Sequence, residues 1–215
     1  MAKRGMLFTI SGPAAAGKGT IVRKLTEEHE FIRVSVSCTT RAPRPGEIDG
    51  VHYHFVTEEE FSDMVEKDMF YEWAHVHLNR YGTPKDKVAE MLDAGYDVIL
   101  EIDVQGSMQV LQKNPDVVGI FIMPPSAEKL EERLINRQTE TAEACRVRMK
   151  NAVKEMEMAK QYPYVVVNED WNEHPGALEE ACRQVLNIMQ ASRNRTRNNV
   201  ELIDSVIDRL SSRYL

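Results

Sequence analysis

The chain has 215 residues, of which 42% are hydrophobic and 28% are charged, and its formal net charge is −7 at pH 7. This composition is typical of a soluble globule, and the length suits one α/β domain with insertions or two small domains. The acidic balance argues against a nucleic acid polymer as a partner for the whole surface. No apolar run approaches the roughly 20 residues of a membrane span, and the apolar segment near the N-terminus is too short for a signal peptide.

Three cysteines, Cys38, Cys145 and Cys182, lie far apart and lack the spacing of metal ligands. Free thiols in a reducing compartment are the expectation, and we therefore predict a cytoplasmic protein without membrane association. The His-x-His pairs at 52–54 and 75–77 permit a zinc hypothesis, but no third ligand has suitable spacing. Histidines on a polar sheet face are the better interpretation.

Residues 7–20 predict a phosphate-binding loop between a buried strand and a helix. The apolar run breaks at Gly12, and Gly17 and Lys18 lead into a segment whose apolar residues share one helical face. Glycines allow backbone N–H groups to converge on phosphate oxygens, and Lys18 can reach the β- and γ-phosphates of a nucleotide. A Gly/Ala-rich turn that binds nothing is the alternative, and the lysine and the flanking elements favour a triphosphate site.

The loop departs from G-x-x-x-x-G-K-[ST] at its last position, where Gly19 replaces Ser or Thr and Thr20 follows. This ending resembles that of adenylate and cytidylate kinases. The replacement removes the hydroxyl expected to approach Mg²⁺, so Thr20 or water must substitute for it.

Buried apolar runs alternate with helical segments along most of the chain. This order indicates a parallel sheet wound with right-handed crossovers, and the fold class is α/β, a P-loop three-layer sandwich with a parallel sheet core. The later strands are expected at 33–37, 97–102, 117–123 and 164–168, and the helices that follow the first at about 84–94, 106–113, 127–136, 141–161 and 175–191.

Residues 35–95 interrupt this rhythm with a Pro/Gly-rich loop and aromatic, alternating segments, which predict an inserted subdomain. Within it we expect a strand pair near 52–56, a strand-like stretch at 69–82, and a capping box in which Thr57 and Glu60 open a helix.

The tail has a different character. Residues 192–199 form a polar, basic stretch that predicts a linker, and residues 200–210 carry apolar side chains on one helical face. A solvated terminal helix and a docking helix for another subunit both account for this pattern.

Two groups of arginines suit anion binding. Arg41 and Arg44 lie in the Pro/Gly-rich loop, and Arg133, Arg137 and Arg148 lie on the helices after residue 123. A rigid guanidinium fork matches phosphate oxygens, especially where two anions must be brought together. Solvated helix faces are the alternative, and the phosphate loop upstream favours phosphate binding.

Several motifs together resemble those of guanylate kinases and occur in the same order. The resemblance covers about residues 5–190, and bacterial members of that family carry a similar tail. It implies transfer of the γ-phosphoryl group of ATP to GMP with Mg²⁺, by a P-loop core with an inserted GMP-binding subdomain and a helical lid. The motifs are 37–47 (SCTTRAPRPGE) with Tyr53, 71–73 (YEW) with 80–83 (RYGT), 101–106 (EIDVQG), and 137–141 (RQTET) with Arg148.

The resemblance also implies a role for each matching residue, with Mg²⁺ held mainly by ATP phosphates and water and contacted by Thr20 and Asp103. The residues implied in GMP binding are Ser37, Arg41, Arg44, Glu47, Tyr53, Glu72, Tyr81, Thr83, Glu101 and Asp103. Those implied in ATP binding are Gly12, Pro13, Ala14, Ala15, Ala16, Gly17, Lys18, Gly19, Thr20 and Arg133. Those implied in catalysis are Lys18, Arg41, Arg137 and Arg148.

In this scheme Glu72 accepts from guanine N1–H and the exocyclic amine, while Ser37 and Thr83 donate toward O6. The GMP phosphate is held by Arg41, Arg44, Tyr53 and Tyr81, with Glu47 orienting the arginines. Two departures from the family pattern are Glu101, where Asp is frequent, and Leu78, where Gly is common.

The resemblance divides the chain into a core (1–34, 96–126 and 153–191), a GMP-binding subdomain (35–95), a lid (127–152), and a basic linker with a C-terminal helix (192–215). Two rival functions stay open. One is another nucleoside monophosphate kinase, which the Gly19-Thr20 ending suggests. The other is a non-catalytic interaction module on the guanylate kinase fold, although such modules typically lack a working phosphate loop.

Overall fold

The centre of the computed structural model, which describes residues 4–76, 78–135, 142–170 and 172–214, is a five-stranded sheet whose paired strands are all parallel. The strands, in spatial order, are β2 (Ile32–Val34), β7 (Asp97–Glu101), β1 (Leu7–Ser11), β8 (Val118–Met123) and β9 (Tyr164–Val167). The apolar runs therefore form strands as predicted. The alternating stretch at 33–37 is only partly a strand, because β2 ends at Val34 and the chain crosses to a second sheet.

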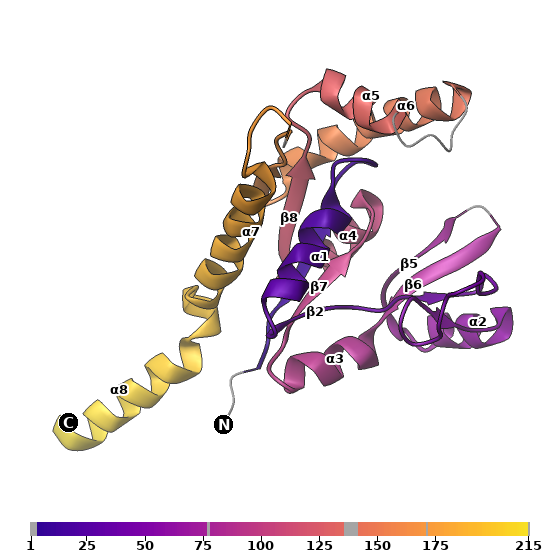
Figure 1. Cartoon of the computed structure of the whole chain (residues 1–215). Coiled ribbons are helices and arrows are strands. Elements are labelled where there is room, and N and C mark those ends of the chain that lie inside the picture. The colour runs from indigo at the N-terminus through magenta and orange to yellow at the C-terminus, as the bar shows by residue number, and fades with distance from the viewer. Residues whose placement is uncertain (1–3, 77, 136–141, 171, 215) are drawn as a thin grey trace.

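Helices cover both faces of the parallel sheet (Figure 1). Phe8 and Ile10 of β1 pack in one core with helices α1 (Lys18–Glu28) and α7 (Ala177–Arg193), while Leu7 belongs to a second core with α3 (Lys85–Asp93) and α4 (Val104–Lys113). Because strands of such a sheet are buried on both sides, they read as continuous apolar runs in the sequence. The three-layer α/β prediction is confirmed.

The insertion forms a second sheet with the order β4-β3-β6-β5. The predicted strand-like stretch at 69–82 is an antiparallel hairpin of β5 (Phe70–Val76) and β6 (Asn79–Pro84). The strand pair expected near 52–56 is instead a parallel pair of β4 (His54–Phe55) with the distant β3 (Cys38–Thr39). These strands have two residues each, too few to show a period.

Helix α2 (Glu58–Glu66) begins at the predicted capping box. The N–H of Glu60 donates to Thr57 Oγ1 at 3.1 Å, and the N–H of Thr57 donates to Glu60 Oε2 at 2.8 Å. Phe61 of α2 stacks on Phe70 of β5 with ring centroids 4.6 Å apart, so the helix and the second sheet share one small core.

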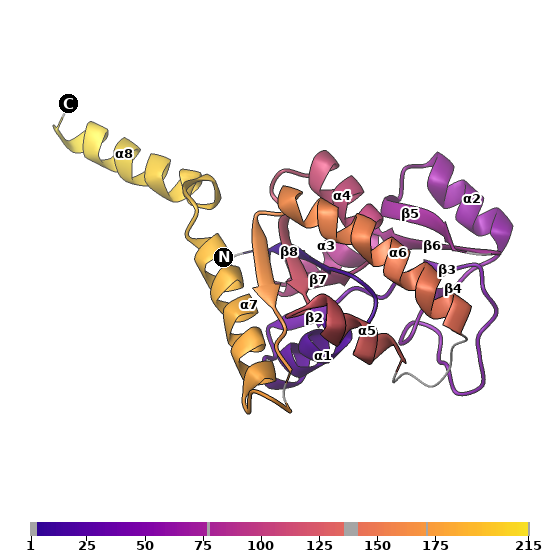
Figure 2. The same cartoon turned by 90° about the horizontal axis from the view of Figure 1, so that it is seen from above.

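Two helices lie over the carboxyl edge of the parallel sheet, α5 (Ala127–Ile135) and α6 (Ala142–Met158), and a short 3₁₀ segment (η1, Ala159–Gln161) connects α6 to β9 (Figures 1 and 2). Leu130 and Leu134 of α5 pack with Ala152 of α6. These two helices include the described residues of 127–152, the segment that the resemblance implies to be a lid.

The basic stretch at 192–199, with its 3₁₀ segment η2 (Thr196–Asn198), is attached to the core rather than being a plain linker. Arg193 forms an ion pair with the buried Asp97 at 2.7 Å, and Arg195 donates to the Tyr164 hydroxyl at 2.9 Å. The sequence pattern does not indicate these two contacts, because Asp97 and Tyr164 are distant in sequence from the arginines they contact.

Helix α8 (Val200–Tyr214) points away from the body in both views (Figures 1 and 2). None of its described residues is buried, so the apolar face predicted at 200–210 is exposed. Within the ranges that the structure describes, no helix has the length and apolar character that crossing a membrane requires.

Candidate active site

The loop between β1 and α1 has the backbone geometry of an anion cradle. Gly12 and Gly17 have φ values of 146° and 91°, and α1 begins directly at Lys18. A Cβ at Gly12 would lie 2.2 Å from the carbonyl oxygen of Ile122, so a larger residue does not fit. The loop therefore leads directly into the N-terminus of α1, whose partial positive charge favours a bound anion.

Lys18 folds back over this loop. Its Nζ donates to the carbonyl oxygens of Gly12 at 2.6 Å and Pro13 at 3.0 Å. These contacts hold the ammonium group at the mouth of the loop, where it can offset negative charge on a bound phosphate.

Asn168, directly after β9, braces the loop from the far side. Its Nδ2 donates to the carbonyl of Ala16 at 2.8 Å, and a Cβ at Gly17 would collide with the same nitrogen at 2.2 Å. Our sequence reasoning missed Asn168, although a polar residue after a buried strand points to the carboxyl edge where α/β proteins bind ligands.

Arg133 of α5 lies beside this brace. Its Nη2 donates to the carbonyls of Asn168 and Glu169, each at 3.1 Å, while the buried Nη1 has no hydrogen-bond partner among the residues that the structure describes. The guanidinium of Arg133 thus connects α5 to the segment after β9, next to the residue that braces the loop.

The unusual Gly19 faces Glu101 at the end of β7. A Cβ at Gly19 would lie 3.1 Å from Glu101 Oε1, closer than most carbon–oxygen contacts, so a Ser or Thr side chain would crowd this carboxyl group. Partial desolvation raises the pKa of Glu101, while the charge of Lys18 acts to lower it. The departure from the loop motif thus accompanies a carboxylate placed directly over the loop.

A cavity of about 330 Å³ opens between the second sheet and the carboxyl edge of the first. Six of the residues implied in GMP binding line it, and they come from both the insertion and the core. The lining residues are Ser37, Tyr53, Glu72, Ala74, Tyr81, Glu101, Ile102 and Asp103.

Glu72 is the most deeply buried charged residue of this cavity, with 7% of its surface exposed. Burial raises the pKa of its carboxyl group, and the nearby charge of Asp103 acts in the same direction. Thr83 donates its hydroxyl to Glu72 Oε1 at 2.7 Å. The hydroxyl of Thr83, predicted to donate toward a guanine O6, is therefore directed at Glu72 in this structure.

The Pro/Gly-rich loop holds its arginines through Glu47. Arg41 Nη2 donates to Glu47 Oε1 at 2.8 Å, and the N–H of Arg44 donates to Oε2 at 2.7 Å. The two hydrogen bonds lower the pKa of Glu47 to about 2, and the bond from Arg41 has the larger effect. The guanidinium of Arg41 also lies 5.5 Å from the ring centroid of Tyr53, which meets Tyr81 edge-on at 5.8 Å.

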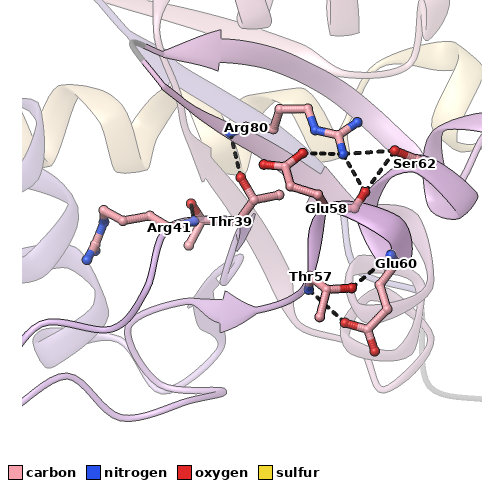
Figure 3. A network of polar contacts seen from close by, with 8 residues as sticks. Thr39, Arg41, Thr57, Glu58, Glu60, Ser62 and Arg80 are labelled. Carbon is pink, nitrogen blue, oxygen red and sulfur yellow. Dashed lines mark hydrogen bonds and ion pairs between the residues drawn. The ribbon is translucent and has the colours of Figure 1, made fainter.

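Arg80 anchors the strand that carries Tyr81 (Figure 3). Its guanidinium pairs with the Glu58 carboxylate, donates to the Glu58 carbonyl and to Ser62 Oγ, and lies 4.6 Å from the ring centroid of Phe61. The backbone N–H of Arg80 donates to Thr40 Oγ1 at 3.0 Å. The network ties β6 to α2 next to the cavity, and no sequence motif indicated it.

Of the two arginines that the resemblance assigns to a lid, the structure describes one. Arg148 is half-buried on α6, and Arg137 lies outside the described residues. On the same helix as Arg148, burial raises the pKa of Glu155, which the charge of Lys18 lowers and that of Asp103 raises. Glu155 of α6 therefore lies within electrostatic range of Lys18 and of Asp103, the N-cap of α4.

The part of the chain that the structure describes has no group of three or more His, Cys, Asp or Glu side chains placed to hold a metal ion. It does offer separate oxygen donors beside the loop, in Glu101 over Gly19 and in Thr20 on the first turn of α1. Asp103 uses Oδ1 to cap α4 at the N–H of Gly106, at 2.9 Å. Such a set fits Mg²⁺, which keeps most of its ligands as water and phosphate oxygens.

A glycine-rich loop at the carboxyl edge of a parallel sheet, joined to a helix that begins with lysine, defines a P-loop nucleotide-binding α/β protein. The nearby cavity contains the buried carboxyl group of Glu72, and the Arg41 guanidinium lies beside Tyr53 in its wall.

Comparison with known proteins narrows the class. The guanylate kinase family model matches residues 4–191, so the chain belongs to the guanylate kinase family. It is 47% identical over 208 residues to a guanylate kinase of Clostridium perfringens, covering 96% of this chain and 93% of that protein. A guanylate kinase of Sphingopyxis alaskensis is 46% identical, covering 98% and 93%. The crystal structure of guanylate kinase from Anaplasma phagocytophilum has a TM-score of 0.68 and 35% identity, covering 90% of this chain and 89% of that one.

Proposed function

We propose that this protein transfers the γ-phosphoryl group of ATP to GMP, giving ADP and GDP. The observation that carries the assignment of the acceptor is the buried Glu72 in the wall of the cavity. Guanine presents two donors, N1–H and the N2 amine, which one carboxylate can accept together. Adenine lacks both, and would leave a buried carboxylate without partners at a cost that discriminates strongly between acceptors.

The acceptor phosphate would lie at the arginine loop. Arg41, Arg44, Tyr53 and Tyr81 would hold it, and Glu47 accepts from the guanidinium of Arg41 and from the backbone N–H of Arg44. The phosphate oxygen that attacks is already anionic at pH 7, so the reaction needs no strong general base. Catalysis then depends on positioning and on neutralising charge.

The donor nucleotide would bind the loop from Gly12 to Thr20, with Lys18 on its phosphates and Arg133 beside them. Mg²⁺ bound with ATP would neutralise part of the phosphate charge. Thr20 and Asp103 would be its neighbours in the protein, and water would complete its ligands. Arg148, together with Arg137 outside the described residues, would bring positive charge to the transferred group when the lid closes and excludes water.

We also propose the division of the chain that the family pattern implies. The core would comprise 1–34, 96–126 and 153–191, with 35–95 as the GMP-binding subdomain and 127–152 as the lid. The contacts of Arg193 and Arg195 extend this core to about residue 199. The free thiols Cys38, Cys145 and Cys182 accord with a cytoplasmic location.

Helix α8 would serve as the docking helix for a second copy of the chain, through its exposed apolar residues. Sedimentation of the full chain and of a chain ending at Asn199 tests this, because only the full chain should assemble. Equal sedimentation, after allowance for mass, would contradict the assignment.

The acceptor assignment is tested by ATP consumption with AMP, CMP, GMP, UMP or no acceptor. GMP should exceed the other acceptors by roughly 10⁴-fold in kcat/KM. Glu72→Gln, nearly isosteric but neutral, should lose most GMP turnover while binding ATP normally. Comparable use of AMP by the wild type, or an unaltered variant, would remove the guanine assignment.

A further inference from the structure

Gly106 lies in the first turn of α4 with its Cα directly against the side chain of Glu72. A Cβ at this position would lie 3.0 Å from Glu72 Oε2, 3.3 Å from Cδ and 3.4 Å from Cγ. The first of these separations is shorter than ordinary carbon–oxygen contacts, so a side chain at residue 106 would have to displace the carboxyl group of Glu72.

The backbone itself does not require glycine here. Gly106 is not among the glycines with positive φ, and it lies within α4, where glycine is a poor helix former compared with alanine. The reason for a glycine at this position therefore lies in what its missing side chain leaves room for.

Glu72 has little freedom to move away. Its Oε1 accepts the Thr83 hydroxyl at 2.7 Å, and only 7% of the residue is exposed. Gly106 is fixed in turn, because its N–H donates to Asp103 Oδ1 at 2.9 Å. One carboxylate oxygen is thus held by Thr83 on β6, and the other rests against the backbone of α4.

We propose that Gly106 is a specificity-positioning residue, which lets the Glu72 carboxylate lie flush against α4 where it can meet both donors of guanine. This inference rests on the proposed use of GMP. Two parallel hydrogen bonds need both oxygens within hydrogen-bond distance at once. A displacement of a few tenths of an ångström therefore weakens the pair, and it leaves the ATP loop unchanged.

The test substitutes Gly106→Ala, with Gln105→Ala as the matched control on the exposed side of the same helical turn. Steady-state kinetics give KM and kcat/KM for GMP, equilibrium titration gives Kd for ATP, and thermal unfolding gives Tm. For Gly106→Ala we expect kcat/KM for GMP to fall at least tenfold, mainly through KM, with Kd for ATP within twofold of wild type. Gln105→Ala should change none of these.

A purely structural role for Gly106 predicts a different result. Overpacking by the added methyl group would lower Tm and weaken the binding of ATP and of GMP together. That parallel loss, or a kcat/KM for GMP within twofold of wild type, would overturn the proposal.

A stability cycle covers the case in which Gly106→Ala folds poorly. Glu72→Ala removes the carboxyl group that the new methyl would strike. The change in Tm caused by Gly106→Ala should therefore be more favourable in the Glu72→Ala background than in the wild type. Equal changes in both backgrounds would overturn the proposed contact. The cycle needs no substrate, so it remains informative if the wild type fails to use GMP, a result that would reject the reaction instead.

Discussion

The hydroxyl of Tyr162 shares a buried hydrogen bond with Ser11 Oγ, at 2.5 Å, although the two residues are 151 positions apart. Tyr162 follows the 3₁₀ segment at the base of α6, and Ser11 is the last residue of β1 before the phosphate loop. A second buried pair lies alongside, in which Ser107 donates to Thr9 Oγ1 at 2.7 Å. The C-terminal end of α6 is therefore tied, through Tyr162, to the strand that supports the loop.

Tyr162→Phe should keep the ring packed edge-on against Phe121 and remove only the hydroxyl. Because Ser11 is then buried without this partner, the free energy of unfolding should fall by about 1–2 kcal/mol. Urea titration measures the change, with Tyr214→Phe on the exposed α8 as the control. A loss no larger than in that control would show that the hydrogen bond adds nothing to stability.

Lys18→Ala should abolish most turnover and leave the fold intact. The ammonium group lies at the mouth of the loop, where negative charge grows in the transition state. Lys24→Ala is the control, since Lys24 lies on the same helix and pairs with Glu28 and Glu179. Rates and circular dichroism of both variants decide the matter. A near-normal kcat for Lys18→Ala would contradict the placement of ATP on this loop.

The arginine loop should lose stability in acid. Arg41 and the N–H of Arg44 lower the pKa of Glu47 from 4.5 to about 2, so the unfolded chain takes up this proton more readily. The stability from this ionised carboxylate is therefore complete above about pH 4.5 and is lost as the pH falls toward 2.

Glu47→Gln should accordingly differ from the wild type in free energy of unfolding at pH 7, and the difference should shrink across that interval. Denaturant titrations from pH 7 downward measure it, and Glu131→Gln on the exposed side of α5 provides the comparison. A difference between wild type and Glu47→Gln that stays constant with pH would exclude Glu47 as the source.

Arg193→Ala should destabilise the protein although it lies far from the site. Asp97 is 1% exposed and also accepts the N–H of Met6 at 2.8 Å, so removing Arg193 leaves a buried carboxylate without its cation. We expect a loss of about 2–3 kcal/mol. Arg183→Ala removes an exposed pair on the same helix and should cost roughly 0.5 kcal/mol or less. Equal losses of unfolding free energy in the two variants would refute the distinction between the buried ion pair and the exposed one.

The elements of the parallel sheet were predictable because burial on both faces leaves continuous apolar runs, such as 97–101 and 118–123. The phosphate loop was predictable because its chemistry is local, with glycines and lysine at fixed spacing. The cavity was predictable only by resemblance, since Ser37, Glu72 and Asp103 come together through the tertiary fold.

The missed contacts share one property, which is that the partners are remote in sequence and neither partner is unusual by itself. Asp97 with Arg193, Tyr162 with Ser11, and Gly106 with Glu72 each need the folded structure to be recognised. The two-residue strands of the insertion were not predictable for another reason, because an alternation of side chains needs more residues to be visible.

The pairing of Asp97 with Arg193 also has a consequence for synthesis on the ribosome. A nascent chain that has reached Asn168 carries every residue assigned to the site, but it lacks α7, which covers one face of the sheet, and the cation that neutralises Asp97. Roughly 25 further residues must be added, which takes on the order of one to five seconds at ordinary elongation rates. We expect the unfinished sheet to expose apolar surface during this interval and to be a substrate for chaperones, so nucleotide binding begins only once the last long helix of the body has emerged.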